Sequence, residues 1–407
     1  MILLFLACNG STEETASPQQ PTFYEDVAPV LADNCVSCHQ TGEIAPFPLV
    51  SYEDTLLVAN AVADSVQERR MPPWLAKDDG SCTEYKHSVW LEDEDLQTIV
   101  DWVQGDQLEG DPANAPALPD PQPSLDDYTH SLALTDVYVP DFGGESDDYR
   151  CFIIDPGFTH DTFINAFEVV PGNDEVVHHV ITYVPSSQAA LADAYERDDA
   201  DPGDGYTCFG GPNVDAFMAS MWAPGKNVWE YPPGTGVPVD AGMPHIVQVH
   251  YNDTGSEEGD ATEVRYRTVD EVDGWLYPWF LVNSDLNIPP NTEGHVESAT
   301  HKMNQWVGFG DFTLTAVGPH MHKLGTGLKA SAKTRDGEEH CLIDVPRWDF
   351  NWQMAYEFVE PIEMNGGTEV TLECTFDSSG VDSYTHWGDG TGDEMCLLTM
   401  FSVFEPF

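Results

Sequence analysis

A proline-rich segment at residues 111–124, DPANAPALPDPQPS, divides the chain into two parts with different sequence periods. Its five prolines and its lack of any hydrophobic period predict a stiff, extended spacer. Before it, apolar residues recur at helical spacing. After it, short runs rich in valine, isoleucine, threonine and aromatic residues end at proline, glycine, asparagine or aspartate, which predicts strands. The length of 407 residues suggests about two to four domains.

The charge of the chain restricts its partners. It carries 71 acidic and 15 basic residues, giving a formal net charge of -56. Nucleic acid is excluded as a partner, because binding to phosphates requires clustered positive charge. The dispersed negative charge favours a highly soluble surface suited to a saline or extracellular setting. Steering of a cationic substrate or redox partner is the alternative interpretation.

The first twenty residues, MILLFLACNGSTEETASPQQ, combine a short apolar run with a polar tail. Leu6-Ala7-Cys8 resembles the end of a bacterial lipoprotein signal, although the sequence has no basic n-region before the apolar run. We therefore expect residues 1–20 to be a signal and tether, with a lipid anchor on Cys8. The expected location is exported, periplasmic or at the cell surface of a bacterium.

The motif Cys35-Val36-Ser37-Cys38-His39 has the spacing of a c-type haem attachment site. Two thiols separated by two residues can form thioethers with the haem vinyl groups, while the adjacent histidine ligates the iron. The motif therefore predicts one covalently bound c-type haem as a cofactor.

Helical patterns surround this motif, and we expect a small all-α domain over residues 21–110. Helices are predicted over 51–70 and about 92–104, and LEDEDLQTIVDWVQG is similar to the terminal helix of small class I cytochromes c. Met71 is the expected second axial ligand, because no other methionine lies between the start of the chain and Met218. His87 and His130 are the competing candidates.

Residues 129–270 and 271–407 are predicted to form two all-β sandwich domains after a linker at 111–128. The strand-like runs include TFINAFEVV, EVVHHVITYV, HIVQVHYN, DFTLTAVG and CLLTMFSVF. Only residues 187–197 have a helical pattern in this part. The fold class expected from the sequence is thus an all-α cytochrome c domain followed by two all-β sandwiches.

Five histidines and one methionine in these domains are candidate metal ligands: His178, His179, His250, His320, His322 and Met395. His320 and His322 lie two residues apart, so on one strand their side chains face the same side and can share a metal. Adjacent His178 and His179 would face opposite sides of a regular strand. Using both for one metal requires a β-bulge or a strand end. The pairs alone are close to chance, and satisfied core or surface histidines are the alternative.

The ordered set, with its flanking residues, resembles the copper type II ascorbate-dependent monooxygenases, the family of dopamine β-hydroxylase and peptidylglycine α-hydroxylating monooxygenase. The resemblance covers about residues 130–407 and rests on YRCFIID, VVHH, WAPG, PPGTGVPVDAG, QVHYN, PHMHKLG and DEMC. It implies an electron-transfer copper at His178, His179 and His250. It also implies an oxygen-activating, catalytic copper at His320, His322 and Met395, with the two coppers facing each other across a solvent-filled cleft.

The resemblance also implies disulfides. Cys374 with Cys396, and Cys151 with Cys208, match family pairs. Cys82 and Cys341 either join two domains or stay free. Six cysteines outside Cys8 and the haem motif fit an oxidising compartment.

Function follows from the resemblance as an expectation. The expected protein is a dicopper monooxygenase that hydroxylates a small organic substrate with O2. The fused haem would relay electrons from an external donor, either a redox protein or an ascorbate-like reductant. The peptide-hydroxylating branch anchors a substrate carboxylate at three positions that here hold Gly318, Leu397 and Thr399, which argues against peptide amidation. A non-catalytic haem and copper electron-transfer or copper-binding protein is the alternative, and peroxidase-like haem chemistry requires that Met71 does not ligate.

Overall fold

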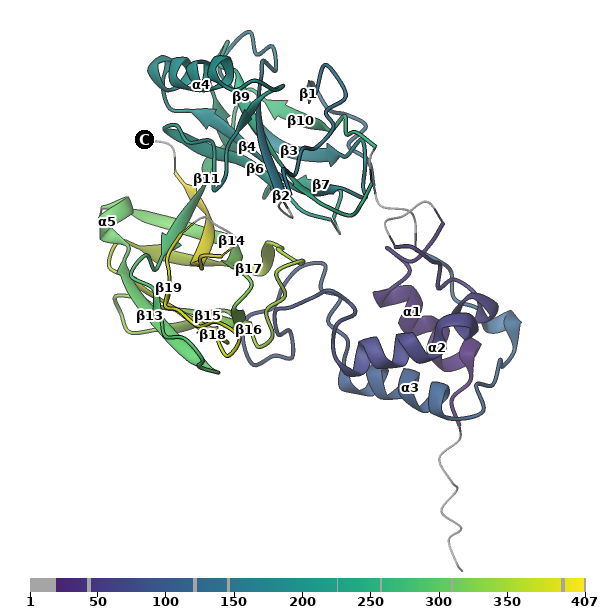
Figure 1. Cartoon of the computed structure of the whole chain (residues 1–407). Coiled ribbons are helices and arrows are strands. Elements are labelled where there is room, and N and C mark those ends of the chain that lie inside the picture. The colour runs from purple at the N-terminus through teal and green to yellow at the C-terminus, as the bar shows by residue number, and fades with distance from the viewer. Residues whose placement is uncertain are drawn as a thin grey trace, which may run out of the picture. The chain divides into compact units, whose positions relative to one another are not determined.

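The computed structural model describes residues 20–41, 45–119, 123–144, 147–224, 226–256, 258–308, 310–388 and 392–405. The chain divides into two compact units (Figure 1). Unit 1 comprises residues 1–41, 46–72 and 91–119, and unit 2 comprises residues 42–45, 73–90 and 120–407. Among the described helices, none is long and apolar enough to cross a membrane.

Unit 1 consists of short helices around a small apolar core. Its elements are η1 (Phe23–Val27), α1 (Ala28–Asn34), α2 (Tyr52–Gln67), α3 (Asp93–Gln104) and the 3-10 turn η2 (Pro112–Asn114). Ser51 caps α2 by accepting a hydrogen bond from the Asp54 N–H at 3.2 Å. Fully buried Trp102 of α3 packs 5.6 Å from the ring of Phe23. Because η2 lies at residues 112–114, the proline-rich segment begins with a 3-10 turn and is not extended over its whole length, contrary to the prediction from the sequence.

The fold class predicted from the sequence is wrong. The chain is mainly a β-sandwich protein, and its helices are few and short. In the described residues no all-α cytochrome c domain is evident over the expected range 21–110. Residues 73–90, inside that range, form no helix and belong to the β-rich unit 2.

Residues 73–90, which we call the strap, are attached to unit 2 by covalent and polar contacts. The Cys82–Cys341 disulfide joins the strap to β16 (Glu339–Val345), so these cysteines are paired, and the bond lies within unit 2 instead of joining two units. Buried Tyr85 donates a hydrogen bond from its hydroxyl to the Leu342 carbonyl at 3.0 Å. Lys86 forms an ion pair with Glu357 at 2.6 Å. The strap thus packs with the strands of unit 2, although in the sequence it lies between two helices of unit 1.

The first half of unit 2 is a sandwich of two antiparallel sheets. Its elements are β1 (His130–Ala133), β2 (Asp147–Ile154), β3 (Thr162–Val170), β4 (Val177–Pro185), α4 (Gln188–Ala200), β5 (Tyr206–Thr207), β6 (Ala216–Trp222), β7 (Val228–Glu230), β8 (Thr235–Val239), β9 (His245–Asn252) and β10 (Glu263–Val269). One sheet has the order β5-β2-β9-β4-β6, and the other contains β1-β10-β3-β8 with β7 paired to β3. Alternating apolar residues from both sheets fill the core between them.

The second half of unit 2 is also built from two sheets packed face to face. Its elements are β11 (Gly274–Val282), β12 (Asn287–Ile288), β13 (His295–Lys302), α5 (Asn304–Val307), β14 (Asp311–Met321), β15 (Gly325–Lys333), β16 (Glu339–Val345), β17 (Tyr356–Asn365), β18 (Glu369–Phe376), β19 (Thr385–His386) and β20 (Cys396–Phe404). The sheet β13-β18-β15-β16 packs against β11-β20-β14-β17. Parallel pairing of β8 with β11 makes the two halves share one nine-stranded sheet.

Candidate functional site

A β-bulge brings the first three histidines together. Strand β4 pairs with β9 through Val177 opposite Tyr251 and then His179 opposite His250, so His178 is the extra residue. A bulged residue lets two adjacent side chains reach the same side of a sheet. His178, His179 and His250 consequently present ring nitrogens that all lie within 4.8 Å of one another. The requirement stated from the sequence, a bulge or a strand end, is confirmed.

The Nδ1 atoms of these rings converge. His179 Nδ1 lies 3.3 Å from His178 Nδ1 and 3.3 Å from His250 Nδ1. On the other side of its ring, His250 Nε2–H donates to Asp147 Oδ1 at 2.9 Å, which leaves the lone pair on Nδ1. A carboxylate that fixes the tautomer of a histidine in this way is a common supporting contact at metal sites.

The spacing of these nitrogens fits a bound metal ion. Two nitrogens that each lie about 2.0–2.1 Å from one tetrahedral metal are about 3.3–3.4 Å apart. His179 Nδ1 has one proton at most and cannot donate to both neighbours, whereas a cation can accept all three lone pairs. His178 Nε2 is buried without a hydrogen-bond partner, so no other contact fixes the tautomer of that ring.

Burial keeps this cluster neutral. His250 is fully buried, and burial lowers the pKa of its ring while the nearby Asp147 carboxylate opposes that shift. Burial, and then the proximity of His250, lowers the pKa of His178 to about 4. The pKa of His179 is lowered further by the same causes. Neutral imidazole is the form that binds copper, zinc, iron or nickel.

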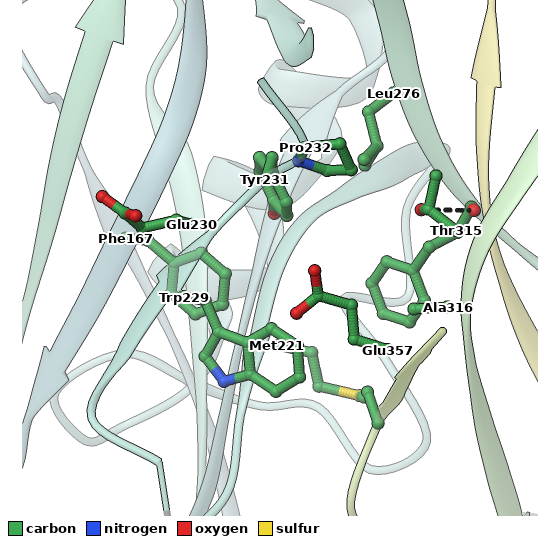
Figure 2. A pocket seen from close by; sticks show the side chains of 12 residues that line it. Phe167, Met221, Trp229, Glu230, Tyr231, Pro232, Leu276, Thr315, Ala316 and Glu357 are labelled. Carbon is green, nitrogen blue, oxygen red and sulfur yellow. Dashed lines mark hydrogen bonds between the residues drawn. The ribbon is translucent and has the colours of Figure 1, made fainter. Parts of the chain in front are cut away.

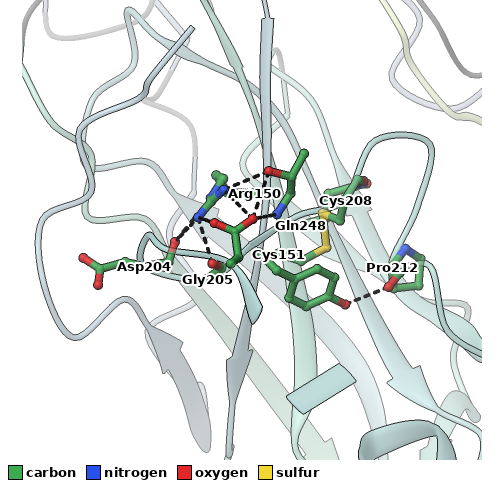
Figure 3. The surroundings of a disulfide bond; sticks show 10 residues. Arg150, Cys151, Asp204, Gly205, Cys208, Pro212 and Gln248 are labelled. Atoms are coloured by element: carbon green, nitrogen blue, oxygen red, sulfur yellow. Dashed lines mark hydrogen bonds and ion pairs between the residues drawn. A yellow bond between two sulfur atoms is a disulfide. The ribbon is translucent and has the colours of Figure 1, made fainter. Parts of the chain in front are cut away.

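A second layer of residues supports the cluster from β2. Tyr149 stacks on His250 with ring centroids 4.0 Å apart, and Phe209 packs 4.7 Å from Tyr149. Phe209 follows Cys208, whose disulfide to Cys151 ties the loop to β2 (Figure 3). Gln248 of β9 donates to the Cys208 carbonyl at 2.7 Å. The family disulfide expected from the sequence is confirmed, and it positions aromatic rings behind a candidate ligand.

The second candidate site lies on the paired strands β14 and β20. Register places His320 opposite Leu397 and Met321 opposite Cys396. His322 and Met395 directly adjoin the last pair of these strands, and the N–H groups of both donate to the same oxygen of Glu394, at 3.0 and 3.1 Å, so the two residues lie side by side at this end of the sheet. The rings of His320 and His322 are 5.3 Å apart. The Cys374–Cys396 disulfide, also expected from the sequence, anchors the strand beside Met395.

Hydrogen bonds orient both histidines in the same sense. His320 Nδ1–H donates to Gln353 Oε1 at 2.8 Å, and His322 Nδ1–H donates to the Asp393 carbonyl at 3.1 Å. Each ring therefore keeps its lone pair on Nε2, in contrast to the Nδ1 lone pairs of the first cluster. Burial lowers the pKa of His320 to about 3, with smaller contributions from His322, His250 and His178. The last two contributions indicate that the clusters are near each other.

Buried Glu394 ties the two strands together at this site. Its carboxylate accepts backbone N–H bonds from His322 at 3.0 Å, Leu324 at 2.5 Å and Met395 at 3.1 Å. Burial raises the pKa of Glu394 to about 7, although these donors oppose the shift. The Glu394 side chain thus connects the turn after His322 to Met395, whose thioether is the third candidate ligand.

The CxxCH motif follows helix α1 in unit 1. Cys35 is the C-cap of α1, and the His39 N–H donates to the Cys35 carbonyl at 2.9 Å. His39 Nδ1–H donates to the Phe47 carbonyl at 3.0 Å, which leaves the lone pair on Nε2 for a metal. Cys35 and Cys38 lie outside the three disulfides. Burial, and then Cys38, raises the pKa of Cys35 to about 12.

The candidates for the second axial haem ligand, Met71, His87 and His130, lie in different elements. Met71 is half-buried after α2, and its N–H donates to the Ser65 carbonyl at 3.3 Å. His87 lies in the strap with a left-handed backbone (φ 56°), and His130 begins β1. Ligation by Met71 stays a prediction. Cys8, the predicted lipid anchor, lies outside the described residues.

A small cavity lies where the two halves of unit 2 meet (Figure 2). Phe167, Trp229 and Tyr231 line it from the first half, and Ala316, Glu357 and Phe401 line it from the second. None of the candidate metal ligands lines this cavity, so it is not part of either candidate site.

Sequence reasoning did not find several residues that support these sites. Asp147, Gln353 and Glu394 contact candidate ligands through hydrogen bonds. Asp147 and Gln353 are separated from their partners by 103 and 33 residues, so no local motif could identify them. Glu394 had a signal, because it stands beside Met395 inside the DEMC signature.

Comparisons with known proteins agree with the location of the second site. Residues 279–402 match the family model "Copper type II ascorbate-dependent monooxygenase, C-terminal domain". The chain is 23% identical over 295 residues to human "Putative DBH-like monooxygenase protein 2", covering 68% of this chain and 56% of that protein. It is 23% identical over 331 residues to "Tyramine beta-hydroxylase" of Caenorhabditis briggsae, covering 74% and 53%.

For a third relative a smaller share of its length is covered, and for a solved structure the structural agreement is low. The chain is 25% identical over 288 residues to "Peptidyl-glycine alpha-amidating monooxygenase A" of Xenopus laevis, covering 68% and 28%. The major capsid protein P2 of bacteriophage PM2 aligns over 68% of this chain and 97% of that one, with 7% identity and a TM-score of 0.28, too low to support a functional statement. The chain spans about half the length of the first relatives. The resemblance to copper monooxygenases expected from the motifs is thus confirmed for the C-terminal part.

Asp147→Asn should weaken metal binding at the first cluster, because the amide cannot hold the His250 tautomer as the carboxylate does. We expect about 10- to 100-fold lower copper affinity there, measured by competition with a chelator. Asp270→Asn is the matched control, because Asp270 accepts from His160 Nε2 at the same 2.9 Å on the exposed surface. Equal affinities in the two variants would contradict the role given to Asp147.

Proposed function

We propose that this chain is a copper-dependent monooxygenase that hydroxylates a small organic substrate with O2. The observation that carries the proposal is the presence of two donor sets within one β-unit: three converging imidazole Nδ1 atoms in the first half, and His320, His322 and Met395 at one end of the paired strands β14 and β20 in the second. The second set falls inside the segment that matches the C-terminal domain of copper monooxygenases.

The donor types support different roles for the two sites. His178, His179 and His250 would hold the electron-transfer copper, since imidazole suits both oxidation states. His320, His322 and Met395 would hold the catalytic copper, since a soft thioether favours the reduced ion that meets O2. Bound copper supplies one-electron redox chemistry and the activation of O2.

The protein's own groups set the geometry in which this chemistry would occur. Asp147 orients His250, Gln353 and the Asp393 carbonyl orient His320 and His322, and Glu394 holds Met395 beside them. Each of these contacts is a hydrogen bond made by groups of the protein itself. Such preorganisation keeps the imidazole lone pairs directed at the metal positions and lowers the cost of binding.

The residues beside the second donor set favour a substrate without a carboxylate anchor. Gly318 pairs with Thr399, and His320 pairs with Leu397, so these uncharged residues line the same face. A Cβ at Gly318 would lie 3.4 Å from Thr399 Cβ and 3.5 Å from Met221 Cε, in ordinary van der Waals contact with both side chains. Hydroxylation of a glycine-extended peptide, which needs such an anchor in the related branch, is not proposed.

The reaction needs electrons from outside the β-unit. Hydroxylation converts a C–H bond and O2 to an alcohol and water and consumes two electrons and two protons. We propose that a c-type haem on Cys35 and Cys38, ligated by His39 and Met71, relays these electrons from an external redox protein or an ascorbate-like reductant. Covalent linkage of the haem to the β-unit raises its effective concentration to about the mM range.

An exported location fits this chemistry. The three disulfides at Cys82–Cys341, Cys151–Cys208 and Cys374–Cys396 are typical of oxidising compartments. Haem attachment to a CxxCH motif and a lipid anchor at Cys8 would place the protein in the periplasm or on the cell surface. O2, the substrate and the electron donor would be its partners there.

Met395→Leu should reduce oxygen uptake to background while copper at the three-histidine cluster is retained. Leucine preserves the volume but removes the thioether sulfur, so the second site loses its soft ligand. The assay is oxygen uptake by copper-loaded protein with a panel of small organic compounds, followed by product mass for the gain of one oxygen atom. Met400→Leu, on the same strand β20 in the core, is the control. A wild-type protein that binds two coppers without oxygen uptake would favour the non-catalytic alternative.

Reduced haem should reoxidise rapidly in the presence of substrate and O2 only when the protein carries copper. The reason is that the proposed route to O2 passes through the copper sites. Stopped-flow absorbance of the haem measures this rate, and the same protein stripped of copper is the control. Haem that stays reduced in the copper-loaded protein would remove it from the reaction, and purified protein without covalent haem would refute the attachment itself.

A further inference from the structure

The turn formed by residues 349–353 joins strands β16 and β17 in the second half of unit 2. Asp349 stabilises it by accepting the Asn351 N–H on its carboxylate at 3.0 Å and the Trp352 N–H on its carbonyl at 3.1 Å. An aspartate that accepts from the backbone two residues later is a common way to fix a tight turn. The turn is therefore a defined local structure and not a slack connection.

The ring of Phe350 in this turn contacts both histidine groups. Its centroid lies 6.1 Å from His178 of the first cluster, with the planes nearly parallel at 20°. It also lies 6.1 Å from His322 of the second site, edge to face at 89°. Both distances fall in the range of favourable aromatic pairs. The rings of His178 and His322 are consequently no more than twice 6.1 Å apart.

A residue of the same turn, Gln353, also contacts a third candidate metal ligand, His320. Gln353 donates from Nε2 to the Phe350 carbonyl at 2.9 Å, and its Oε1 accepts from His320 Nδ1–H at 2.8 Å. The position of the Phe350 backbone and the tautomer of His320 therefore depend on one amide side chain. Lys323, next to His322, approaches the Phe350 ring with its Nζ 5.8 Å from the centroid.

We propose that the turn at residues 349–353 is a positioning element that fixes the separation of the two copper sites, with the half-buried ring of Phe350 as the spacer between His178 and His322. The inference rests on the proposed function for the presence of copper. Its contacts join one ligand of the first site to two of the second, in addition to the shared sheet and the apolar core through which the two halves of unit 2 also meet. An aromatic ring then occupies space that the family resemblance assigns to solvent, and it sets the distance that an electron crosses.

The magnetic interaction between two Cu(II) ions tests this proposal without any turnover. The experiment loads full-length protein with Cu(II), measures the copper content, and records the Cu–Cu dipolar coupling by pulsed dipolar electron paramagnetic resonance. We expect one narrow distribution of couplings in the wild type and a weaker or broader one in Phe350→Ala, because dipolar coupling falls with the cube of the distance. Phe350→Leu, which retains more volume, should lie between the two.

Phe163→Leu is the matched control, because Phe163, on strand β3, which carries no candidate ligand, is also half-buried and packs 6.3 Å from Trp275. This variant should leave the coupling unchanged. Unchanged coupling in both Phe350 variants, with two coppers still bound, would overturn the spacer role and leave the proposed function intact. A wild-type protein that fails to bind two coppers would overturn both. Because Phe350 is only half-buried, the leucine variant should fold and give a result even if the alanine variant does not.

Discussion

The antiparallel pairing of β14 with β20 is the constraint on which the candidate active site depends. This pairing brings His322 and Met395, which directly adjoin its last pair, to the same end of the sheet as His320, although they are 73 positions apart in the sequence. The Cys374–Cys396 disulfide fixes the end of β20, and Glu394 clamps it to the turn after His322. A shift of one residue in the pairing would move Met395 to the opposite face. The covalent and polar contacts at this strand end therefore protect the geometry of a site and not only the stability of a sheet.

Both donor sets contain neutral imidazole rings, but the rings of the two sets keep their lone pairs on different nitrogens. Burial lowers the pKa values of His178, His179, His250 and His320, so these rings stay neutral and keep lone pairs for a metal at neutral pH. In the first set Asp147 directs His250 to use Nδ1, whereas in the second Gln353 and the Asp393 carbonyl leave Nε2 for the metal. Hydrogen bonds from outside each set thus decide which nitrogen faces the ion. The two halves of unit 2 share one continuous sheet, which gives the sets a common frame.

Local patterns predicted much of this structure. The strand runs, the helix at 187–197, the bulge required by His178 and His179, and two disulfide pairs all follow from spacing or from family motifs. The all-α domain was wrong because helical periodicity on both sides of residues 73–90 says nothing about where that segment packs. Its contacts with Cys341, Leu342 and Glu357 span about 260 residues of sequence, beyond the reach of any local rule. Asp147, Gln353 and Phe350 were missed for the same reason.

We expect each of the two donor sets to bind one copper ion. The decisive measurement is anomalous diffraction at the copper absorption edge from crystals of copper-loaded protein. Two peaks should appear, one about 2.0–2.1 Å from the Nδ1 atoms of His178, His179 and His250, and one beside His320, His322 and the Met395 sulfur. A single peak, or copper at positions that exclude either donor set, would show that the protein does not hold the two copper ions in this way.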